Sequence, residues 1–129
     1  MDESEPLLKG IKVVEIATYI FGPGSAAILS DFGADVIKIE APGRGDPLRY
    51  AHKAPPFMPL EFGYIWQQDN RNKRSIGLDM KSTEGREVLL KLVREADILI
   101  TNFNSISRPS ADFISRPMLR LLRLSCCQI

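Results

Sequence analysis

The sequence predicts an α/β fold, built on a Rossmann-like parallel sheet with flanking helices that is incomplete in this chain. Two observations carry this prediction. Short runs with strand character recur four times, at 11–17, 35–40, 74–80 and 97–103. Segments with helical character separate the first run from the second and the third from the fourth, and this alternation is typical of parallel strands joined by right-handed crossovers.

The first half of the chain supplies two strands and a helix. The stretch IKVVEIA at 11–17 is too short, and too rich in β-branched residues, for a typical helix. A short helix is expected over 23–32, where Pro23 can start it and Gly33 can cap its end. The stretch DVIKIE at 35–40 follows as the second strand.

Residues 41–72 contain five prolines and predict an irregular excursion with at most short helical turns. His52 is expected to be an exposed loop residue. Trp66, with Phe62 and Tyr64, is expected to bury the excursion against the sheet, or alternatively to offer an aromatic ledge to an adenine ring.

Regular structure returns with RSIGLDM at 74–80, the third strand. Ser82 is a suitable N-cap, and Glu84 lies in the first turn of a helix expected over 83–96. Leucine, valine and alanine recur there at helical spacing, so one face of this helix should cover the sheet. The fourth strand is DILITNF at 97–103.

Composition narrows the functional classes. The 129 residues, 44% hydrophobic with a formal net charge of +1, fit one globular domain and argue against a nucleic-acid binder. No run approaches the roughly 20 apolar residues that span a bilayer, so no membrane partner is expected. The first ten residues lack a signal core, which favours the cytoplasm. Cys126 and Cys127 are adjacent and are expected to be reduced thiols.

Residues 22–40 also fit a dinucleotide-binding fingerprint. Gly22, Gly24 and Ala27 match G-x-G-x-x-G/A, and Glu40 follows at a suitable distance for a ribose ligand. However, four residues separate Ala17 from Gly22, whereas the fingerprint places its first glycine directly after the strand. The alternative is a turn whose small residues let helix and sheet approach closely.

Two longer stretches, 31–49 and 70–103, together resemble the N-terminal part of family III CoA-transferases. This group includes formyl-CoA and carnitine-CoA transferases and α-methylacyl-CoA racemases, and the resemblance runs from about Pro6 to Phe103. It implies that residues 1–103 form a Rossmann-like portion that binds coenzyme A, with acyl-CoA as substrate. Full-length members form interlocked homodimers, which this chain is not expected to form.

The resemblance also implies the cofactor-binding positions. They are Ile20, Phe21, Ala41, Leu78, Asp79, Met80, Lys81, Asn102, Phe103 and Asn104. Ile20 and Ala41 lack the polar or basic side chains of the formyl-CoA branch, which leaves the substrate branch open. From the residues themselves, Arg71, Lys73, Arg74 and Lys81 flank the third strand and form a candidate phosphate-binding cluster. The alternative is a solvated basic rim.

No catalytic residue and no metal site is assigned. The resemblance implies an aspartate nucleophile that forms a mixed anhydride and then an aspartyl-CoA thioester, but the family places it beyond the residues of this chain. The chain alone is therefore expected to be inactive. Four aspartates within it that could be considered, Asp35, Asp46, Asp79 and Asp97, are expected to be solvated or capping groups.

Residues 104–129 depart from the family pattern and are expected to be a divergent tail, irregular or forming a short helix, as a frameshift would produce. A basic amphipathic helix, with Arg116, Arg120 and Arg123 on one face, is the alternative and would contact a membrane or a partner. Two other functions stay open for the whole chain: a non-catalytic CoA- or nucleotide-binding module, and a fragment of an NAD-dependent oxidoreductase.

Overall fold

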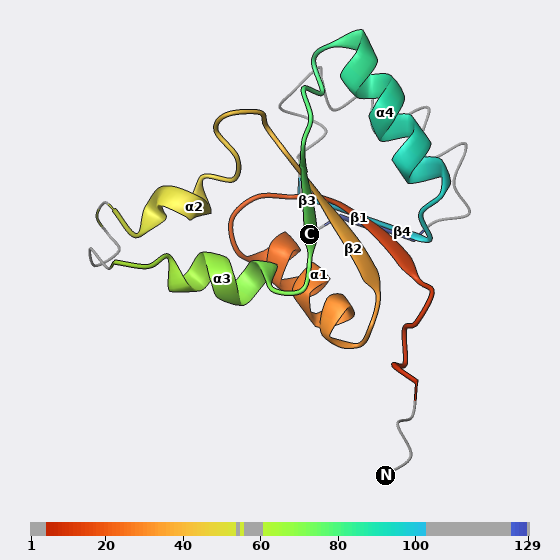
Figure 1. Ribbon diagram of the computed structural model, residues 1–129, viewed down its shortest axis with the longest axis horizontal. Coiled ribbons are helices and arrows are strands. Elements are labelled where there is room, and N and C mark those ends of the chain that lie inside the picture. Colours follow the sequence, from red (N-terminus) through yellow and green to blue (C-terminus); the bar gives the residue numbers. More distant parts are fainter. Residues whose placement is uncertain (1–4, 54, 56–60, 103–124, 129) are drawn as a thin grey trace.

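The computed structural model describes residues 5–53, 55, 61–102 and 125–128 (Figure 1). Its elements in chain order are β1 (Lys12–Ile16), α1 (Phe21–Asp31), β2 (Asp35–Glu40), α2 (Leu48–Ala51), α3 (Tyr64–Asn70), β3 (Arg74–Gly77), α4 (Thr83–Arg94), β4 (Ile98–Thr101) and β5 (Ser125–Gln128). The four predicted strands and both predicted helices are present. The expected excursion contains two short helices, α2 and α3.

The strands form one parallel sheet in the order β3-β2-β1-β4-β5. The chain moves outward from β1 to β3 and then crosses back to place β4 on the other side of β1, which is the strand order of doubly wound α/β folds. This confirms the predicted parallel sheet with flanking helices. The tail was expected to be irregular or helical, so the strand β5 was not predicted. The other residues of the tail, 104–124 and 129, lie outside the described residues.

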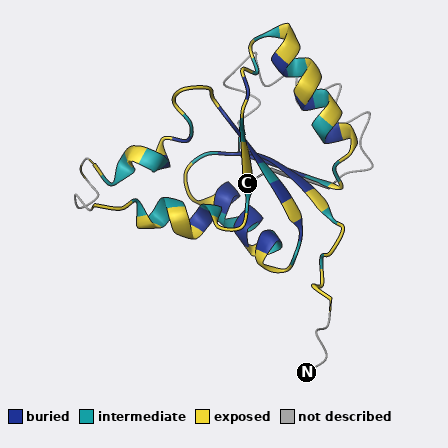
Figure 2. Ribbon diagram, in the orientation of Figure 1, coloured by how far each residue is buried: buried dark blue, intermediate teal, exposed yellow. Residues whose placement is uncertain are grey.

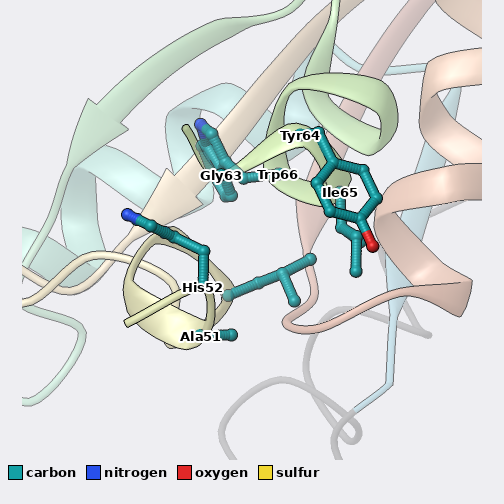
Figure 3. Close-up of a pocket in the computed structure, with 7 residues that line it drawn as sticks. Ala51, His52, Gly63, Tyr64, Ile65 and Trp66 are labelled. Atoms are coloured by element: carbon teal, nitrogen blue, oxygen red, sulfur yellow. The ribbon is translucent and has the colours of Figure 1, made fainter. Parts of the chain in front are cut away.

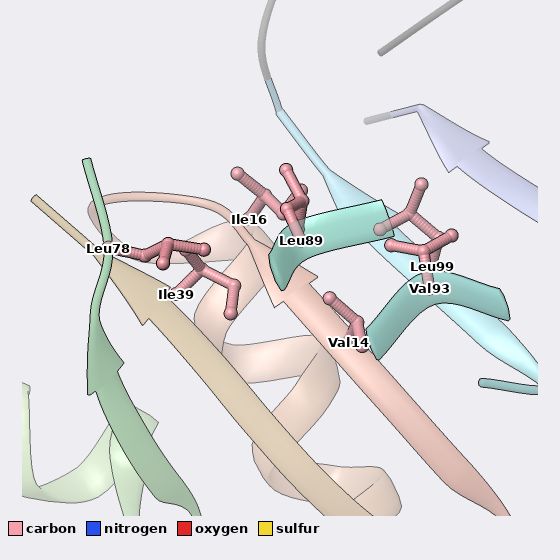
Figure 4. Close-up of a cluster of buried hydrophobic side chains, with 7 residues drawn as sticks. All are labelled: Val14, Ile16, Ile39, Leu78, Leu89, Val93 and Leu99. Atoms are coloured by element: carbon pink, nitrogen blue, oxygen red, sulfur yellow. The ribbon is translucent and has the colours of Figure 1, made fainter. Parts of the chain in front are cut away.

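Helices α1 and α4 lie on opposite faces of the sheet (Figure 1). On the α4 face, Leu89 and Val93 of the helix pack with Val14, Ile16 and neighbouring strand residues in a wholly apolar cluster (Figure 4). On the α1 face a smaller cluster joins Ala26 to Val13, Val36 and Ile100, which alternate with these residues along the strands, and to Ala34 just before β2. Burial is greatest where helix and sheet meet (Figure 2).

The ends of both long helices follow the sequence signals. Gly33 ends α1 with a φ of +98°, a left-handed conformation that glycine adopts without steric cost. Ser82 is the N-cap of α4, and its hydroxyl oxygen accepts a hydrogen bond from the Gly85 amide at 3.0 Å. Within the described residues, no helix combines the length and the apolar character needed to cross a membrane.

Candidate functional site

The carboxyl ends of β1 and β4 lie side by side at the centre of the sheet. The chain leaves β1 toward β2 on one side, whereas β4 neighbours β5 on the other. In open α/β sheets, ligands bind in the crevice at such a reversal of strand order. A Cβ added to Gly22 would lie 2.5 Å from the Ala17 Cβ and 3.9 Å from the Asn102 Cβ, so the first turn of α1 is pressed against both strand ends.

The loop between β1 and α1 is longer than the dinucleotide-binding fingerprint allows. The strand ends at Ile16, and the helix begins only at Phe21, so Gly22 belongs to the first turn of the helix. Asn102 fixes the loop from the β4 side: its side-chain oxygen accepts from the Thr18 amide at 3.2 Å, and its amide nitrogen donates to the Thr18 carbonyl at 2.7 Å. The spacing that an NAD site needs is therefore not met.

The positions implied by the family resemblance gather at this carboxyl edge where the structure describes them. Ile20 and Phe21 are exposed at the start of α1, and Ala41 is exposed after β2. Asp79 and Lys81 are exposed after β3, and Asn102 is half-buried after β4. Met80 and Leu78 pack in the α4-side core, so their side chains serve packing. Phe103 and Asn104 lie outside the described residues.

The expected phosphate cluster is not brought together. Arg71 is ion-paired with Asp31 at the end of α1, and Arg74 with Asp35 at the start of β2, so both lie at the amino edge of the sheet. Lys81 alone of the four cations follows a strand and lies at the carboxyl edge. The physical reason is simple: residues before and after one strand lie at opposite edges of a sheet.

The fourth member of that cluster, Lys73, is buried beneath α3. Its ammonium group lies 2.7 Å from a Glu15 carboxylate oxygen and donates to the carbonyls of Pro23 and Asp69 at 2.7 and 2.6 Å. Burial lowers the pKa of Lys73, and the Glu15 charge partly offsets this effect. The side chain therefore ties α1, α3 and β1 together and is not free to meet a phosphate.

Glu15 and Lys38 lie at the centre of a buried ionic network. Their side chains are 0% and 1% exposed, and the Lys38 ammonium lies 2.6 Å from Glu15 Oε1. It also donates to the Ala17 carbonyl at 2.8 Å and lies 3.0 Å from a carboxylate oxygen of Asp46. Both residues occupy strand positions facing α1, where neighbouring parallel strands bring opposite charges together.

Glu40 ends β2 and joins this network to the excursion. Arg49 donates to both of its carboxylate oxygens, at 2.8 and 2.6 Å, and Ser75 and the Asp46 amide donate to it as well. Burial alone would raise the pKa of Glu40, but these hydrogen bonds outweigh burial and lower the pKa to about 2. A carboxylate so engaged is not available to a ribose, which removes the remaining support for an NAD site.

Asp46 has a role that its sequence context did not reveal. It was expected to be solvated or capping, and its Oδ1 does accept from the Leu48 amide at the start of α2, but its side chain is only 1% exposed and also accepts from the distant Tyr19 amide. The available signal was the pair of charges at inward positions of two strands, Glu15 and Lys38, which required further partners in a buried setting.

A small pocket, open to solvent, lies between α2 and α3 (Figure 3). It is lined in part by His52 and Trp66, and the Arg49 guanidinium lies 3.8 Å from the centre of the Trp66 ring. His52 is half-buried and its Nδ1 has no hydrogen-bond partner among the described residues, so the expectation of an exposed loop residue was wrong. Phe62 and Tyr64, expected to bury the excursion, are 64% and 54% exposed.

Asp69 of α3 faces the first turn of α1. Its Oδ1 lies 3.7 Å from the point where a Cβ on Gly24 would stand, and its other oxygen has no hydrogen-bond partner among the described residues. Burial raises the pKa of this carboxyl group, and the nearby Lys73 charge opposes the rise.

Across the described part of the chain, no three His, Cys, Asp or Glu side chains come together in a way that could hold a metal ion.

Comparison with known proteins gives a consistent result. The family model described as CoA-transferase family III matches residues 8–113. The formyl-CoA:oxalate CoA-transferases of Escherichia coli O139:H28 and Shigella boydii serotype 18 are each 48% identical over 98 residues, covering 75% of this chain and 23% of the relative. The chain therefore matches about a quarter of the length of these curated relatives.

Solved structures agree. A CAIB/BAIF family protein from Brucella suis superposes with a TM-score of 0.80 at 37% identity, covering 96% of this chain and 33% of that protein. Rv3272 from Mycobacterium tuberculosis superposes with a TM-score of 0.77 at 26% identity, covering 94% of this chain and 34% of that one.

Proposed function

The chain belongs to CoA-transferase family III, and from this premise we propose that the carboxyl edge of its sheet binds the coenzyme A part of an acyl-CoA. The observation that carries the proposal is the gathering of positions from four separate chain segments at this edge. Ile20, Ala41, Lys81 and Asn102 follow β1, β2, β3 and β4 respectively, although up to 82 residues separate them in sequence.

The chemistry of this edge suits an anionic, elongated ligand. Helix α1 begins here with no side-chain cap from Ile20 and no acidic residue in its first turn, so no carboxylate of that turn opposes the positive end of its dipole. Lys81 supplies an exposed cation at the same edge, and Phe21 supplies exposed apolar surface. Coenzyme A carries a pyrophosphate, a 3′-phosphate and a long pantetheine arm, which call for both kinds of contact.

For the whole protein we propose transfer of CoA from an acyl thioester to a carboxylic acid. In the two-step route of the family, an aspartate attacks the thioester carbonyl and releases the CoA thiolate, leaving a mixed anhydride. The thiolate then attacks the aspartyl carbonyl, which frees the first acid and forms an aspartyl-CoA thioester. The acceptor carboxylate then attacks the aspartyl-CoA thioester and releases the CoA thiolate, leaving a second mixed anhydride. The thiolate attacks the acceptor's carbonyl in that anhydride, which returns the free aspartate and yields the new acyl-CoA thioester.

The described carboxylates at this edge are engaged in other contacts. This supports the proposal that the nucleophile comes from another part of the whole protein. Glu15, Glu40 and Asp46 are buried and ion-paired with Lys38, Lys73 or Arg49. Asp79 is exposed, but its Oδ1 accepts the Lys81 amide at 2.9 Å within a turn. We therefore expect the 129-residue chain to bind CoA without catalysing transfer, and detectable turnover by this chain alone would contradict that expectation.

Calorimetric titration of the purified chain with CoA and, separately, with NADH tests the binding proposal. CoA should bind and NADH should not. Lys81→Ala should weaken CoA binding about tenfold, equivalent to one charged hydrogen bond. The matched control is Arg74→Ala, which removes an exposed cation from the opposite edge and should leave the affinity unchanged. Binding of NADH alone, or equal losses in both variants, would reject the proposed site.

A further inference from the structure

Three consecutive residues of the β1–α1 loop are each held by a side chain from a neighbouring strand or loop. The Ala17 carbonyl accepts from Lys38 of β2, and both backbone groups of Thr18 are bound by Asn102 after β4. The Tyr19 amide donates to Asp46 Oδ1 at 3.2 Å. The segment just before the proposed ligand site is therefore fixed from both sides of the crevice.

Tyr19 has an unusual backbone. Its φ is +66°, in the left-handed region that non-glycine residues rarely adopt and that is least favourable for bulky side chains. Its side chain is mostly exposed, so core packing does not hold it there. The hydrogen bond to Asp46 is the contact described at its amide, and strained conformations persist where surrounding groups over-determine them.

Asp46 is itself fixed from three directions. Its own amide donates to Glu40 at 2.9 Å, its Oδ1 also accepts from the Leu48 amide at 2.9 Å, and its second carboxylate oxygen faces the Lys38 ammonium at 3.0 Å. The carboxylate therefore has a defined position relative to β2, and through Tyr19 it transmits that position to the start of α1.

We propose that Asp46 is a positioning residue that holds Tyr19 in its left-handed conformation and so sets the ligand-binding geometry of the β1–α1 loop. This inference rests on the proposed function for the identity of the ligand, but the loop geometry itself does not depend on it. Asp46 touches neither reacting atoms nor, in this role, the ligand; it acts through the backbone of residues 19–21.

The variant Asp46→Ala removes the acceptor, and Asp35→Ala is the matched control because it removes an exposed, ion-paired aspartate from the other end of β2. Asp46→Ala should raise the Kd for CoA about tenfold, the cost of a residue left in the left-handed region without its restraint. Asp35→Ala should leave the Kd unchanged. If Asp46→Ala fails to fold, Asp46→Leu is measured instead, since its side chain has nearly the same shape but no oxygen that can accept from the Tyr19 amide.

A double-mutant cycle separates positioning from general destabilisation. Glycine adopts positive φ freely, so in a Tyr19→Gly background the loss of Asp46 should change the Kd for CoA no more than about twofold. The fall in Tm caused by Asp46→Ala should persist in that background, because the ion pair with Lys38 and the hydrogen bond from the Leu48 amide are lost in both. A purely structural Asp46 would weaken CoA binding equally in the two backgrounds, and that result would overturn the proposal.

A measurement made in the absence of CoA distinguishes the positioning role of Asp46 from the proposed binding of CoA. Amide hydrogen exchange at Tyr19, followed by NMR, should accelerate in Asp46→Ala and stay unchanged in Asp35→Ala. If wild type binds no CoA while this acceleration is seen, the proposed function fails and the role of Asp46 in holding the loop stands. If exchange at Tyr19 is the same in wild type and Asp46→Ala, the positioning role is refuted whatever the affinity for CoA.

Discussion

Substitution of Gly22 by alanine tests the close approach between the start of α1 and the end of β1. The added Cβ would lie 2.5 Å from the Ala17 Cβ, well inside any normal carbon–carbon contact. Neither methyl group can be moved by a side-chain rotation, because a Cβ is fixed to its backbone. The start of α1 must therefore shift away from β1 by about 1 Å, and overpacking of this kind costs about 1–3 kcal/mol.

Gly24→Ala is the matched control in the same helix. Its nearest neighbour would be Asp69 Oδ1 at 3.7 Å, which is ordinary van der Waals contact. Since alanine is favoured over glycine in helices by up to about 1 kcal/mol, this variant should be neutral or slightly stabilised. Urea unfolding, followed by far-ultraviolet circular dichroism, should thus give free energies of unfolding that differ by about 2 kcal/mol between the variants. Equal stability of the two would refute the assigned contact.

Two further substitutions test the buried charges. Lys73→Met should lower the free energy of unfolding by about 3–5 kcal/mol, because it leaves a buried Glu15 oxygen without its cation. Glu40→Gln should destabilise the chain at neutral pH. The folded-state pKa of Glu40 is about 2 against an ordinary 4.5, so its stabilising contribution is complete above about pH 4.5 and is lost as the pH falls toward 2. Wild type and Glu40→Gln should therefore converge in stability across that interval, as measured by urea unfolding at a series of pH values.

An exposed lysine provides the control for Lys73→Met. Lys53→Met, at a lysine that is exposed beside Tyr50, should change the free energy of unfolding by less than about 0.5 kcal/mol. A comparable loss in both lysine variants would show that Lys73 is not held in a buried pair. For Glu40, a stability difference from the glutamine variant that is constant between pH 7 and 2 would contradict the assigned pKa.

Local patterns were sufficient for the elements of this fold. Each predicted element is present, and each depends on residues that are close together in sequence. Examples are the strand runs IKVVEIA and DVIKIE, the Ser82 N-cap and the helix end at Gly33. The strand order depends on contacts between distant segments: β4 pairs with β1 across more than 80 residues. Alternation of strands and helices indicates a parallel sheet, but it does not say on which side of β1 the fourth strand returns.

The candidate site was predictable only in part, for a similar reason. Positions such as Lys81 and Asn102 were obtained from family resemblance, and the topology explains why they share one edge. The cations Arg71 and Arg74 were grouped with Lys81 by their proximity in sequence, whereas the edge on which a residue lies depends on strand direction. The burial of Lys73 depends on Glu15, 58 residues away, and no local pattern specifies such a pair.

On the α1 face of the sheet, apolar and charged side chains occupy different ends of the strands, and this bears on the role of the buried ionic network around Glu15 and Lys38. Toward the amino ends of the strands this face is apolar, with Val13 and Val36 under α1, and toward the carboxyl ends it carries Glu15, Lys38 and Glu40. A buried ion pair contributes little net stability compared with an apolar pair of the same volume, so stability alone does not account for this change.

Directional bonds do what apolar contacts cannot: they fix single backbone groups, here the Ala17 carbonyl and the Tyr19 amide, at defined points. The α4 face shows the contrast, since its cluster of leucine, isoleucine and valine side chains holds a helix against the sheet through apolar contacts that have no preferred direction. Charges thus replace apolar residues on this face at the carboxyl edge, where the β1–α1 loop lies beside the proposed ligand site. Under the proposal made for Asp46, the network serves to fix the geometry of that loop, and Asp46 is the residue that contacts it through the Tyr19 amide.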